Sequence, residues 1–554
     1  MPLRIIPYGA AGREPFSPVT LFRPLPRSLS RPLAWAVVLA WVLNMGLLVK
    51  RSYVDAGPLS LAADLARYGT AAQWRGVYYR GEKIGFMVGQ TVGTDDGFEL
   101  QEDGRLQMTL LGASSEARVR TTARVDRQFN LRSFSFSLDP GTGPTEIKGT
   151  LDGLQLALEV VTPSGRRTET RQLEEAPALS LNLSRRLAAE GLAAGRHYEM
   201  HVLDPATLRN APMQVDVEGR ELVRSAGLSL PAFRVRTTFV GISSTSWITD
   251  TGEVVREESP LGLMVVKESR ERALARSVSS QVRTDLLEAA AVVPDTKERI
   301  DDPRLVKLLR LTLDGVDLGG PDLQGAGQSV RGTEFTLRDP EDLKAEAADP
   351  AAREYLAAEP FLESDAPEIV AEAAAAVKGV QGPRAQAERL VRHVNALLEK
   401  KPTVSLPSAR EVLRTRIGDC NEHTALYVAM ARALGIPARI AVGLVYLRGA
   451  FYYHAWPEVY VDEGGGRGLW LPVDPTLNEF PADATHVRLA RGGLDRQATI
   501  LGVIGRARMK FLELRVREGS VPNLVGASTA PRAANIPLPR RETGRGRCWS
   551  SPGR

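Results

Sequence analysis

Apolar and polar residues alternate along much of the chain between residues 74 and 275. In Phe134–Leu138 and Leu154–Val160 every second residue is apolar, which is the pattern of a strand that buries one face. Clusters of Gly, Pro and Asp separate such stretches, and one helical stretch over Ser180–Glu190 interrupts them. The pattern predicts a large, mainly antiparallel sheet, curved around a helix, within a β domain that spans residues 70–350.

The spacing of apolar residues changes from two to three or four beyond residue 366. Ala385–Leu398 has the period of a helix, and so does Cys420–Leu434, which a Gly-Ile-Pro sequence should end. Three strands are expected after it, over Ala438–Leu447, Phe451–Val461 and Leu469–Val473. This change of period indicates a second domain over residues 366–500.

One segment near the N-terminus is apolar enough to suggest a membrane span. Pro32–Val49 holds 18 residues without a charge and is followed by Lys50-Arg51, a length at the lower edge for crossing the hydrocarbon core. Residues 1–31 are basic, so the positive-inside rule predicts a cytoplasmic N-terminus, a transmembrane helix and the rest of the chain on the extracytoplasmic, periplasmic side. A cleaved signal peptide ending near Val54-Asp55-Ala56 is the alternative, but the long basic start favours a retained anchor.

The net charge of +5 is unevenly distributed along the chain. Residues 1–51 carry +6 and residues 526–554 carry +5, so the long stretch between them is mildly acidic. Nucleic-acid binding needs a basic folded face, and we therefore expect no nucleic-acid partner. The Pro-, Arg- and Gly-rich residues 520–554 predict a disordered basic tail.

Only two cysteines are present, Cys420 and Cys548. Cys548 lies in the predicted tail, so a disulfide between the two is geometrically feasible but not indicated. A zinc site would need further Cys or His ligands at close spacing, and we expect no metal and no cofactor. A single cysteine in a domain with histidines elsewhere is a candidate nucleophile, although a lone cysteine is most often a small buried residue.

Cys420, His454 and Asp474 follow one another on a predicted helix start, a strand and a strand end. Cys420 lies in the first helical turn, where free N–H groups and the helix dipole stabilise a thiolate and where its own N–H can face an oxyanion. His454 can act as general base, and Asp474 can orient its ring. Each residue alone is more commonly structural, but their occurrence together favours a catalytic triad.

Two neighbours of Cys420 leave alternatives open. His423 lies three residues further along the same helix and could approach the thiol instead of His454, although a packing role is favoured. Glu422 could support the adjoining loop or be solvated.

Four segments resemble the transglutaminase-like superfamily of papain-type thiol enzymes. They are Arg416–Cys420 (RIGDC), Ala433–Arg439 (ALGIPAR), Tyr453–Trp456 (YHAW) and Val473–Thr476 (VDPT). The resemblance covers roughly residues 366–493. It implies an α+β catalytic domain in which the nucleophile helix packs on an antiparallel sheet, with Cys420 as nucleophile, His454 as base and Asp474 as orienting acid.

Members of this superfamily differ in activity: some cross-link glutamine to amines, some hydrolyse peptides or amide-linked glycans, and some have lost catalysis. The animal members that cross-link use calcium and an oxyanion-stabilising tryptophan upstream of the nucleophile. Trp247 is the only tryptophan between residue 75 and Cys420, and no EF-hand-like acidic loop is present, so a calcium-regulated cross-linker is not expected.

The sequence therefore leads to a membrane-anchored thiol hydrolase, a protease or amidase that acts on a protein or peptide substrate through a thioester. Protein-glutamine amine acyl transfer, the transglutaminase reaction, is the first alternative, because only the group that reaches the thioester differs. A non-catalytic cell-envelope binding module is the second alternative.

Overall fold

The structure of the protein is a computed structural model. It describes Tyr68 and residues 72–517, with gaps at 111–112, 226, 260–261, 276–284, 286–287, 289–290, 316–322, 494–499 and 501–505. The predicted basic segment 1–31, the predicted anchor Pro32–Val49 and the predicted tail 520–554 lie outside the described residues. Within the part of the chain that is described, no helix is both long and apolar enough to cross a membrane.

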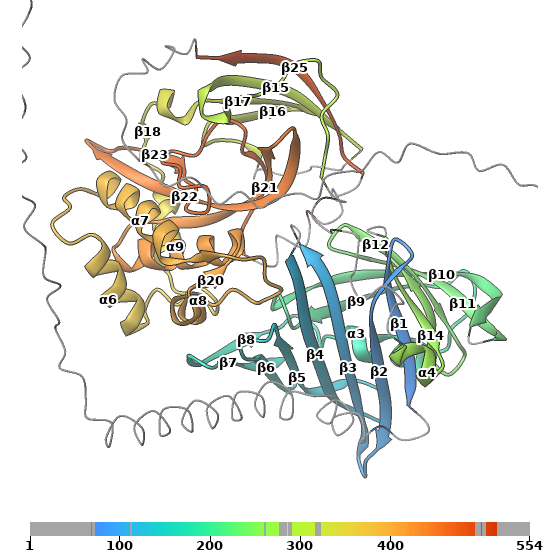
Figure 1. The fold of residues 1–554 in the computed structure, drawn as a ribbon. Coiled ribbons are helices and arrows are strands. Elements are labelled where there is room, and N and C mark those ends of the chain that lie inside the picture. Colours follow the sequence, from blue (N-terminus) through green and yellow to red (C-terminus); the bar gives the residue numbers. More distant parts are fainter. Residues whose placement is uncertain are drawn as a thin grey trace, which may run out of the picture.

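A 14-stranded antiparallel sheet forms the N-terminal part of the described chain (Figure 1). Its strands are β1 (Gln73–Tyr79), β2 (Glu82–Gly93), β3 (Gly97–Leu110), β4 (Ala113–Asp126), β5 (Leu131–Asp139), β6 (Thr145–Asp152), β7 (Gln155–Thr162), β8 (Gly165–Gln172), β9 (His197–Asp204), β10 (Arg209–Ser225), β11 (Leu228–Phe239), β12 (Ile242–Ile248), β13 (Val254–Glu258) and β14 (Leu263–Glu268). Their order runs from β8 down to β1 and then from β14 down to β9, so β8 and β9 are the two edges. In β7, Leu156, Leu158 and Val160 are buried on one face, as the alternation predicts, whereas Leu154 precedes the strand and is exposed.

In the sequence, helix α3 (Ser180–Glu190) follows β8 and precedes β9, the two edge strands. It has the bounds that the sequence predicts. Leu179, just before the helix, packs in a core with side chains of β3 to β7, whereas Leu187 packs in a core with side chains of β9 to β12. The helix therefore touches both halves of the sheet, which curves around it (Figure 1).

Three strands of the predicted β domain belong to a different sheet. β15 (Val306–Asp314), β16 (Gln328–Arg331) and β17 (Glu334–Arg338) join β25 (Arg508–Val516) in the order β16-β17-β15-β25. The buried side chains of Leu309, Leu311 and Phe335 share one hydrophobic core with the helices and strands that follow. The predicted domain of residues 70–350 thus comprises the 14-stranded sheet and part of a second unit, because β15 pairs with a strand at the far end of the described chain.

The second unit surrounds helix α9 (Cys420–Ala433), which is buried at every residue from Glu422 to Arg432. A sheet in the order β18-β23-β22-β21-β24 packs on one side of α9, and α6, α7 and α8 pack around it (Figure 1). These elements are α6 (Pro367–Ala376), α7 (Pro383–Leu397), α8 (Ala409–Thr415), β18 (Glu346–Ala347), β21 (Ala438–Leu447), β22 (Ala450–Gly464), β23 (Arg467–Pro472) and β24 (Val487–Arg491). Shorter elements are α4 (Arg270–Leu274), η2 (Pro303–Leu305), η4 (Pro340–Asp342), η5 (Pro350–Leu356) and the parallel pair β19 (Glu399–Lys400) and β20 (Ile417–Gly418). The result is the predicted α+β fold.

The 14-stranded sheet contacts this second unit near the start of α9. The Ser164 hydroxyl, in the turn between β7 and β8, donates to the Glu411 carboxylate of α8 at 2.6 Å. Arg167 of β8 pairs with Asp365 at 2.9 Å. Leu406 packs into the hydrophobic core of the sheet, so the sheet holds the segment that precedes α8 in place.

A buried ion cluster joins β22 to β21 and to β24, the strand beyond β21. Glu458 of β22 is fully buried and pairs with Arg439 of β21 at 2.8 Å and with Arg491 of β24 at 2.9 Å. Arg488 of β24 binds the other carboxylate oxygen. Burial alone would raise the pKa of Glu458, but the three guanidinium groups outweigh burial and lower the pKa to about 2. The carboxylate therefore stays ionised and holds three strands together.

We expect Glu458→Gln to lower the free energy of unfolding by about 3–5 kcal/mol, because it leaves three buried guanidinium groups without their carboxylate. Denaturant unfolding followed by tryptophan fluorescence measures the change. Glu368→Gln is the matched control: the Glu368 side chain is 41% exposed and pairs with Arg410, so its loss should cost about 1 kcal/mol or less. Equal effects of the two substitutions would contradict the role assigned to the cluster.

Candidate active site

Cys420 is the first residue of α9, and two acidic side chains cap the helix there. The side chain of Asp419 accepts a hydrogen bond from the Asn421 N–H at 2.9 Å. The side chain of Glu422 accepts one from the Asp419 N–H at 2.8 Å. This capping box binds N–H groups that a helix start otherwise leaves unpaired, and it fixes the position of Cys420.

The partly buried thiol of Cys420 contacts the backbone of β22. It receives a hydrogen bond from the backbone N–H of Ala455. The hydroxyl of Thr424, one turn further along α9, donates to the Ala455 carbonyl oxygen at 3.1 Å. These contacts bring the first turn of α9 to the stretch of β22 that carries His454.

The electrostatic surroundings of Cys420 favour a neutral thiol. Burial raises its pKa well above the ordinary thiol range, and the charges of Asp419, Glu422 and Asp474 raise it further. The Ala455 N–H acts in the opposite direction but does not outweigh them. The sequence predicts a helix start that stabilises a thiolate; the structure differs because the free N–H groups are bound to acidic side chains, which oppose a further anion.

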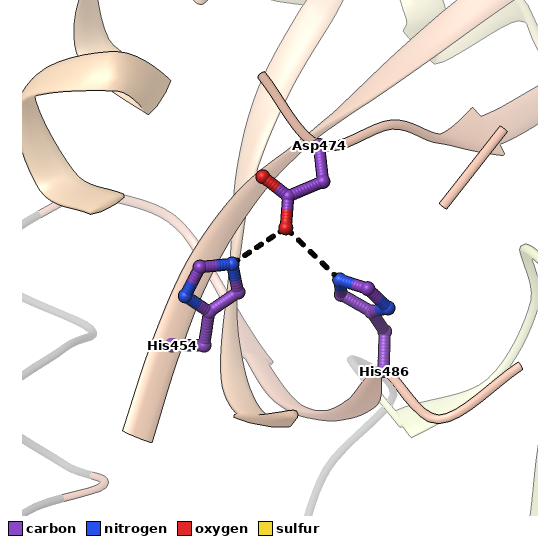
Figure 2. A group of neighbouring side chains, drawn as sticks. All are labelled: His454, Asp474 and His486. Atoms are coloured by element: carbon purple, nitrogen blue, oxygen red, sulfur yellow. Dashed lines mark hydrogen bonds and ion pairs between the residues drawn. The ribbon is translucent and has the colours of Figure 1, made fainter. Parts of the chain in front are cut away.

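Asp474 lies two residues after β23 and is fully buried. Its Oδ2 accepts a hydrogen bond from Nε2 of His454 at 2.7 Å (Figure 2). Its Oδ1 accepts hydrogen bonds from the N–H groups of Thr476 and Leu477 at 2.7 and 2.9 Å. Burial would raise the pKa of Asp474, but the rings of His454 and His486 together outweigh burial and hold the pKa well below its ordinary range. Asp474 is thus an ionised acceptor, and Nε2 of His454 carries the hydrogen that it donates.

His486 also binds Asp474, a contact that sequence reasoning missed. Its Nε2 lies 3.2 Å from the Asp474 oxygen that His454 contacts (Figure 2). Its Nδ1 lies 3.1 Å from the carbonyl oxygen of Asp483. The ring packs edge-on against Trp456, which stacks on His454. His486 comes directly before β24 and outside every motif of the predicted triad, so nothing in the sequence marks it.

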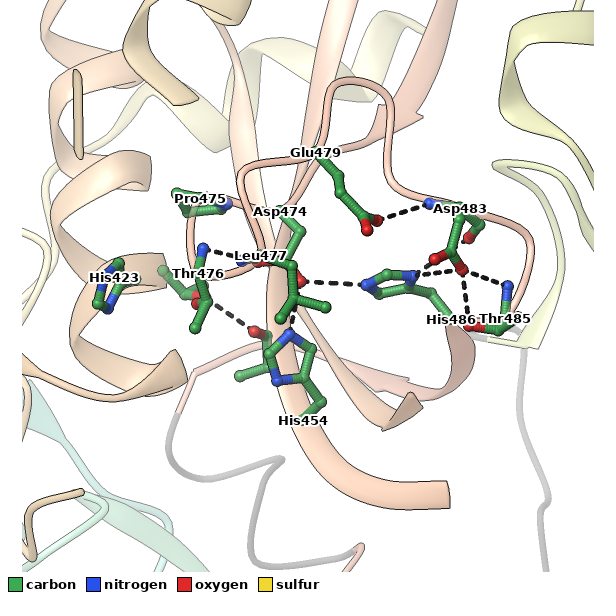
Figure 3. A network of polar contacts seen from close by, with 12 residues as sticks. His423, His454, Asp474, Pro475, Thr476, Leu477, Glu479, Asp483, Thr485 and His486 are labelled. Carbon is green, nitrogen blue, oxygen red and sulfur yellow. Dashed lines mark hydrogen bonds and ion pairs between the residues drawn. The ribbon is translucent and has the colours of Figure 1, made fainter. Parts of the chain in front are cut away.

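Two further carboxyl groups lie beside His486 (Figure 3). Oδ1 of Asp483 is 3.4 Å from Nδ1 of His486, and the Asp483 N–H donates to the Glu479 carboxyl group at 3.1 Å. Burial and the charges of Asp483 and Asp474 raise the pKa of Glu479 to about 8, so this group is protonated at neutral pH. Burial would also raise the pKa of Asp483, but its contacts with His486 and Thr485 outweigh burial and lower it.

His423, the alternative base, is a buried packing residue in this structure. Its Nδ1 binds the carbonyl oxygen of Asp419 at 2.7 Å. Its Nε2 has no hydrogen-bond partner among the described residues, and its ring lies apart from the His454–Asp474 pair (Figure 3). Burial lowers the pKa of His423, which favours a neutral ring.

Glu422 supports the adjoining loop and is not solvated; these were the two alternatives that the sequence left open. Its carboxylate is buried and accepts hydrogen bonds from the hydroxyls of Thr403, at 3.1 Å, and Ser405. The next residue, Leu406, packs against the 14-stranded sheet. This segment therefore connects the sheet to the cap of α9.

His454, Asp474 and His486 are residue types that can bind metals, and their ligand atoms lie within 4.8 Å of one another. Both Nε2 atoms, however, lie at hydrogen-bond distance from one carboxylate oxygen, which is the arrangement of two N–H donors that share an acceptor. The second nitrogen of His486 is bound to Asp483. We therefore assign these side chains to a hydrogen-bonded network.

Residues 371–475 match the family model of the transglutaminase-like superfamily. This match confirms the resemblance that the sequence motifs indicate, and it supports a thiol enzyme in general. A comparison with curated proteins gives no match.

Several solved structures are similar to parts of the chain. A candidate cysteine protease from Cytophaga hutchinsonii is 18% identical, with 39% of this chain and 86% of that chain covered and a TM-score of 0.24. A β-barrel-like protein of a domain family of unknown function from Brucella abortus is 13% identical, with 36% and 96% covered and a TM-score of 0.28. A candidate protease from Parabacteroides distasonis is 12% identical, with 64% and 69% covered and a TM-score of 0.18. At these scores, no property of those proteins is carried over to this chain.

The raised pKa of Glu479 predicts that replacing this carboxyl group changes the stability of the protein by an amount that depends on pH. The folded protein binds the Glu479 proton more tightly than the unfolded chain does, in which the pKa of a glutamate is about 4.3. Glu479 therefore lowers the free energy of unfolding progressively as the pH rises from about 4.3 to about 8. Glu479→Gln keeps an oxygen for the Asp483 N–H and removes the charge. We expect its melting temperature to exceed that of the wild type by more at pH 8 than at pH 5 in thermal scans.

Glu388→Gln is the control for this prediction, because the Glu388 side chain is 49% exposed. It should change the melting temperature little at any pH. An effect of Glu479→Gln that is the same at every pH would show that Glu479 is ionised in the folded protein.

Proposed function

We propose that this transglutaminase-like domain is a thiol hydrolase that cleaves amide or peptide bonds, with Cys420 as nucleophile, His454 as general base and Asp474 as the group that orients the base. The main support is one short stretch of β22. The N–H of Ala455 binds the thiol, and the residue before it, His454, binds the ionised Asp474. The nucleophile, the base and the acid that orients the base are thus connected through His454 and Ala455, two consecutive residues of β22.

Asp474 sets which nitrogen of His454 can act as base. Because Nε2 donates to Asp474, Nδ1 carries the free electron pair. In the first step Nδ1 takes the proton of Cys420 while the sulfur bonds to the carbonyl carbon of the substrate. The protonated ring then gives this proton to the leaving amine, the carbon–nitrogen bond breaks, and a thioester remains.

Transfer of the Cys420 proton to His454 makes the sulfur a nucleophile, because the thiolate and not the thiol attacks. Burial raises the pKa of the Cys420 thiol, so this step needs the neighbouring base. In the second half, Nδ1 takes a proton from water, the water oxygen adds to the thioester carbon, and the thiol leaves with the proton. The N–H of Cys420, in the first turn of α9, would donate to the oxyanion in both halves.

The proposal includes a location. With Pro32–Val49 as an anchor and the basic residues 1–31 in the cytoplasm, the thiol would act on proteins or peptides outside the cytoplasm. Protease added to intact spheroplasts should then digest the domain. Digestion only after the membrane is permeabilised would contradict this location.

A peptide library made by digesting a proteome tests the reaction. The full chain should create new peptide N-termini, detected by mass spectrometry, if water resolves the thioester. A primary amine joined to glutamine side chains would instead indicate transamidation. We expect no product with Cys420→Ala and rates lower by factors of about 10² to 10⁴ with His454→Gln or Asp474→Asn, because the base or its orientation is lost.

Cys548→Ala is the matched control, because it removes the other cysteine of the chain and should leave the rate unchanged. If the wild type gives neither product and His454→Gln does not alter alkylation of Cys420, the proposal fails. The binding-module alternative would then be favoured.

A further inference from the structure

A cavity of about 220 Å³ lies where the 14-stranded sheet meets the unit that carries Cys420. On the side of the sheet it is lined by Arg171 of β8 and by Thr207 and Leu208 of the turn between β9 and β10. On the other side it is lined by residues of α9, of β21 and of the segment that follows η5, among them Asn421, Ala425, Ile440, Phe361 and Leu362. The cavity therefore exists only where the two units meet, because each supplies part of its wall.

This cavity borders the thiol on one side of α9. Cys420 and Thr424 face β22, where both bind the backbone of Ala455. Asn421 and Ala425 are the residues that follow them, so they lie on the adjacent face of the helix, and this face forms part of the cavity wall. An extended peptide advances about 3.3 Å per residue. A side chain one or two residues away from a carbonyl group held at Cys420 can therefore reach the cavity.

Asn421 offers a hydrogen-bond acceptor that the rest of the protein does not use. Its Oδ1 atom is buried and has no hydrogen-bond partner among the described residues, and its side chain lines the cavity. A buried amide oxygen without a donor is unfavourable, so a bound group that carries an N–H would be stabilised there. The N–H groups of a peptide are donors of this kind.

The charged side chains of the cavity wall already have partners within the protein. Arg171 pairs with Glu169, and Glu359 pairs with Arg432 at 2.6 Å. Arg209 likewise interacts with another group. The remaining side chains of the wall are mostly apolar, namely Leu208, Pro360, Phe361, Leu362, Pro407 and Ile440. The cavity therefore favours an uncharged, apolar group that lies beside an N–H donor.

We infer that this cavity is a specificity pocket: a substrate residue within two positions of the scissile bond places an aliphatic or aromatic side chain in it, while a peptide N–H donates to Oδ1 of Asn421. The inference rests on the proposed function, and it gives the 14-stranded sheet a part in selecting the substrate. The volume of about 220 Å³ is below the ~300–1,000 Å³ of pockets for drug-sized ligands, so it suits one side chain. Charged side chains are disfavoured, because burying an unpaired charge is costly.

Alkylation of Cys420 by two reagents tests the pocket without requiring that peptides be cleaved. In a full-length Cys548→Ala background, iodoacetamide reports the reactivity of the thiol, and N-benzyliodoacetamide adds a phenyl ring that the pocket can bind. Each rate is divided by the rate of the same reagent with glutathione. We expect the benzyl reagent to react about tenfold faster than iodoacetamide, because burial of an aromatic ring contributes a factor of at least that order. A carboxyl group on the ring should remove this advantage.

Thr207→Trp should fill the pocket from the side of the sheet and lower the ratio of the two rates to about one. Because the ratio uses the iodoacetamide rate of the same variant, any change in the reactivity of the thiol cancels. Thr94→Trp is the matched control. The Thr207 hydroxyl donates to Asp204 beside its turn at 2.8 Å, and the Thr94 hydroxyl likewise donates to Asp96 at 3.0 Å, in the turn between β2 and β3. The ratio for Thr94→Trp should equal that of the parent protein.

The N–H group of the reagent tests the role of Asn421. N-benzyl-N-methyliodoacetamide has no N–H and should react about fivefold more slowly than N-benzyliodoacetamide, which is the usual contribution of one hydrogen bond. With Asn421→Ala the two reagents should differ only as much as they do with glutathione, because the acceptor is gone.

If the benzyl reagent has no advantage in the parent protein, or if Thr207→Trp and Thr94→Trp change the advantage equally, the inference is overturned. An advantage that only Thr207→Trp removes, together with no cleavage of peptides, would leave the inference intact and count against the proposed function alone. If peptides are cleaved, apolar residues should predominate at one position within two residues of the cleaved bond. Thr207→Trp should then remove that preference.

Discussion

A fully buried, ionised carboxylate needs donors around both of its oxygens, and Asp474 draws them from three parts of the chain. Its own turn supplies two N–H groups, β22 supplies His454, and the loop before β24 supplies His486. Each donor belongs to a different segment, so this one charge fixes those segments relative to one another. The geometry of the proposed triad follows from satisfying that carboxylate.

The acidic side chains that cap the start of α9 hold Cys420 in place but disfavour its thiolate. Asp419 and Glu422 cap the helix and connect it to the segment that packs against the 14-stranded sheet, which holds Cys420 in place. The same acidic groups disfavour a thiolate at Cys420. Precise placement of the sulfur is thus obtained together with a proton that a neighbouring base must remove.

Local patterns carry much of the fold and of the candidate site. The bounds of α3, the start of α9 and the pairing of His454 with Asp474 follow from apolar periods, stop residues and short motifs, all of which act over a few residues. His486 was not predictable, because its contact with Asp474 depends on how a loop returns to the sheet. The charge state of Cys420 depends on the summed field of several acidic groups, which no motif encodes.

The pairing of β15 with β25 constrains the order in which a growing chain can fold. The strands of the 14-stranded sheet are complete at Glu268, so this sheet can form while the rest of the chain is still being synthesised. β15 contributes Leu309 and Leu311 to the core around α9, yet its partner strand ends only at Val516. The unit that carries the thiol therefore closes last, and only on polypeptides that the ribosome has translated through the end of β25.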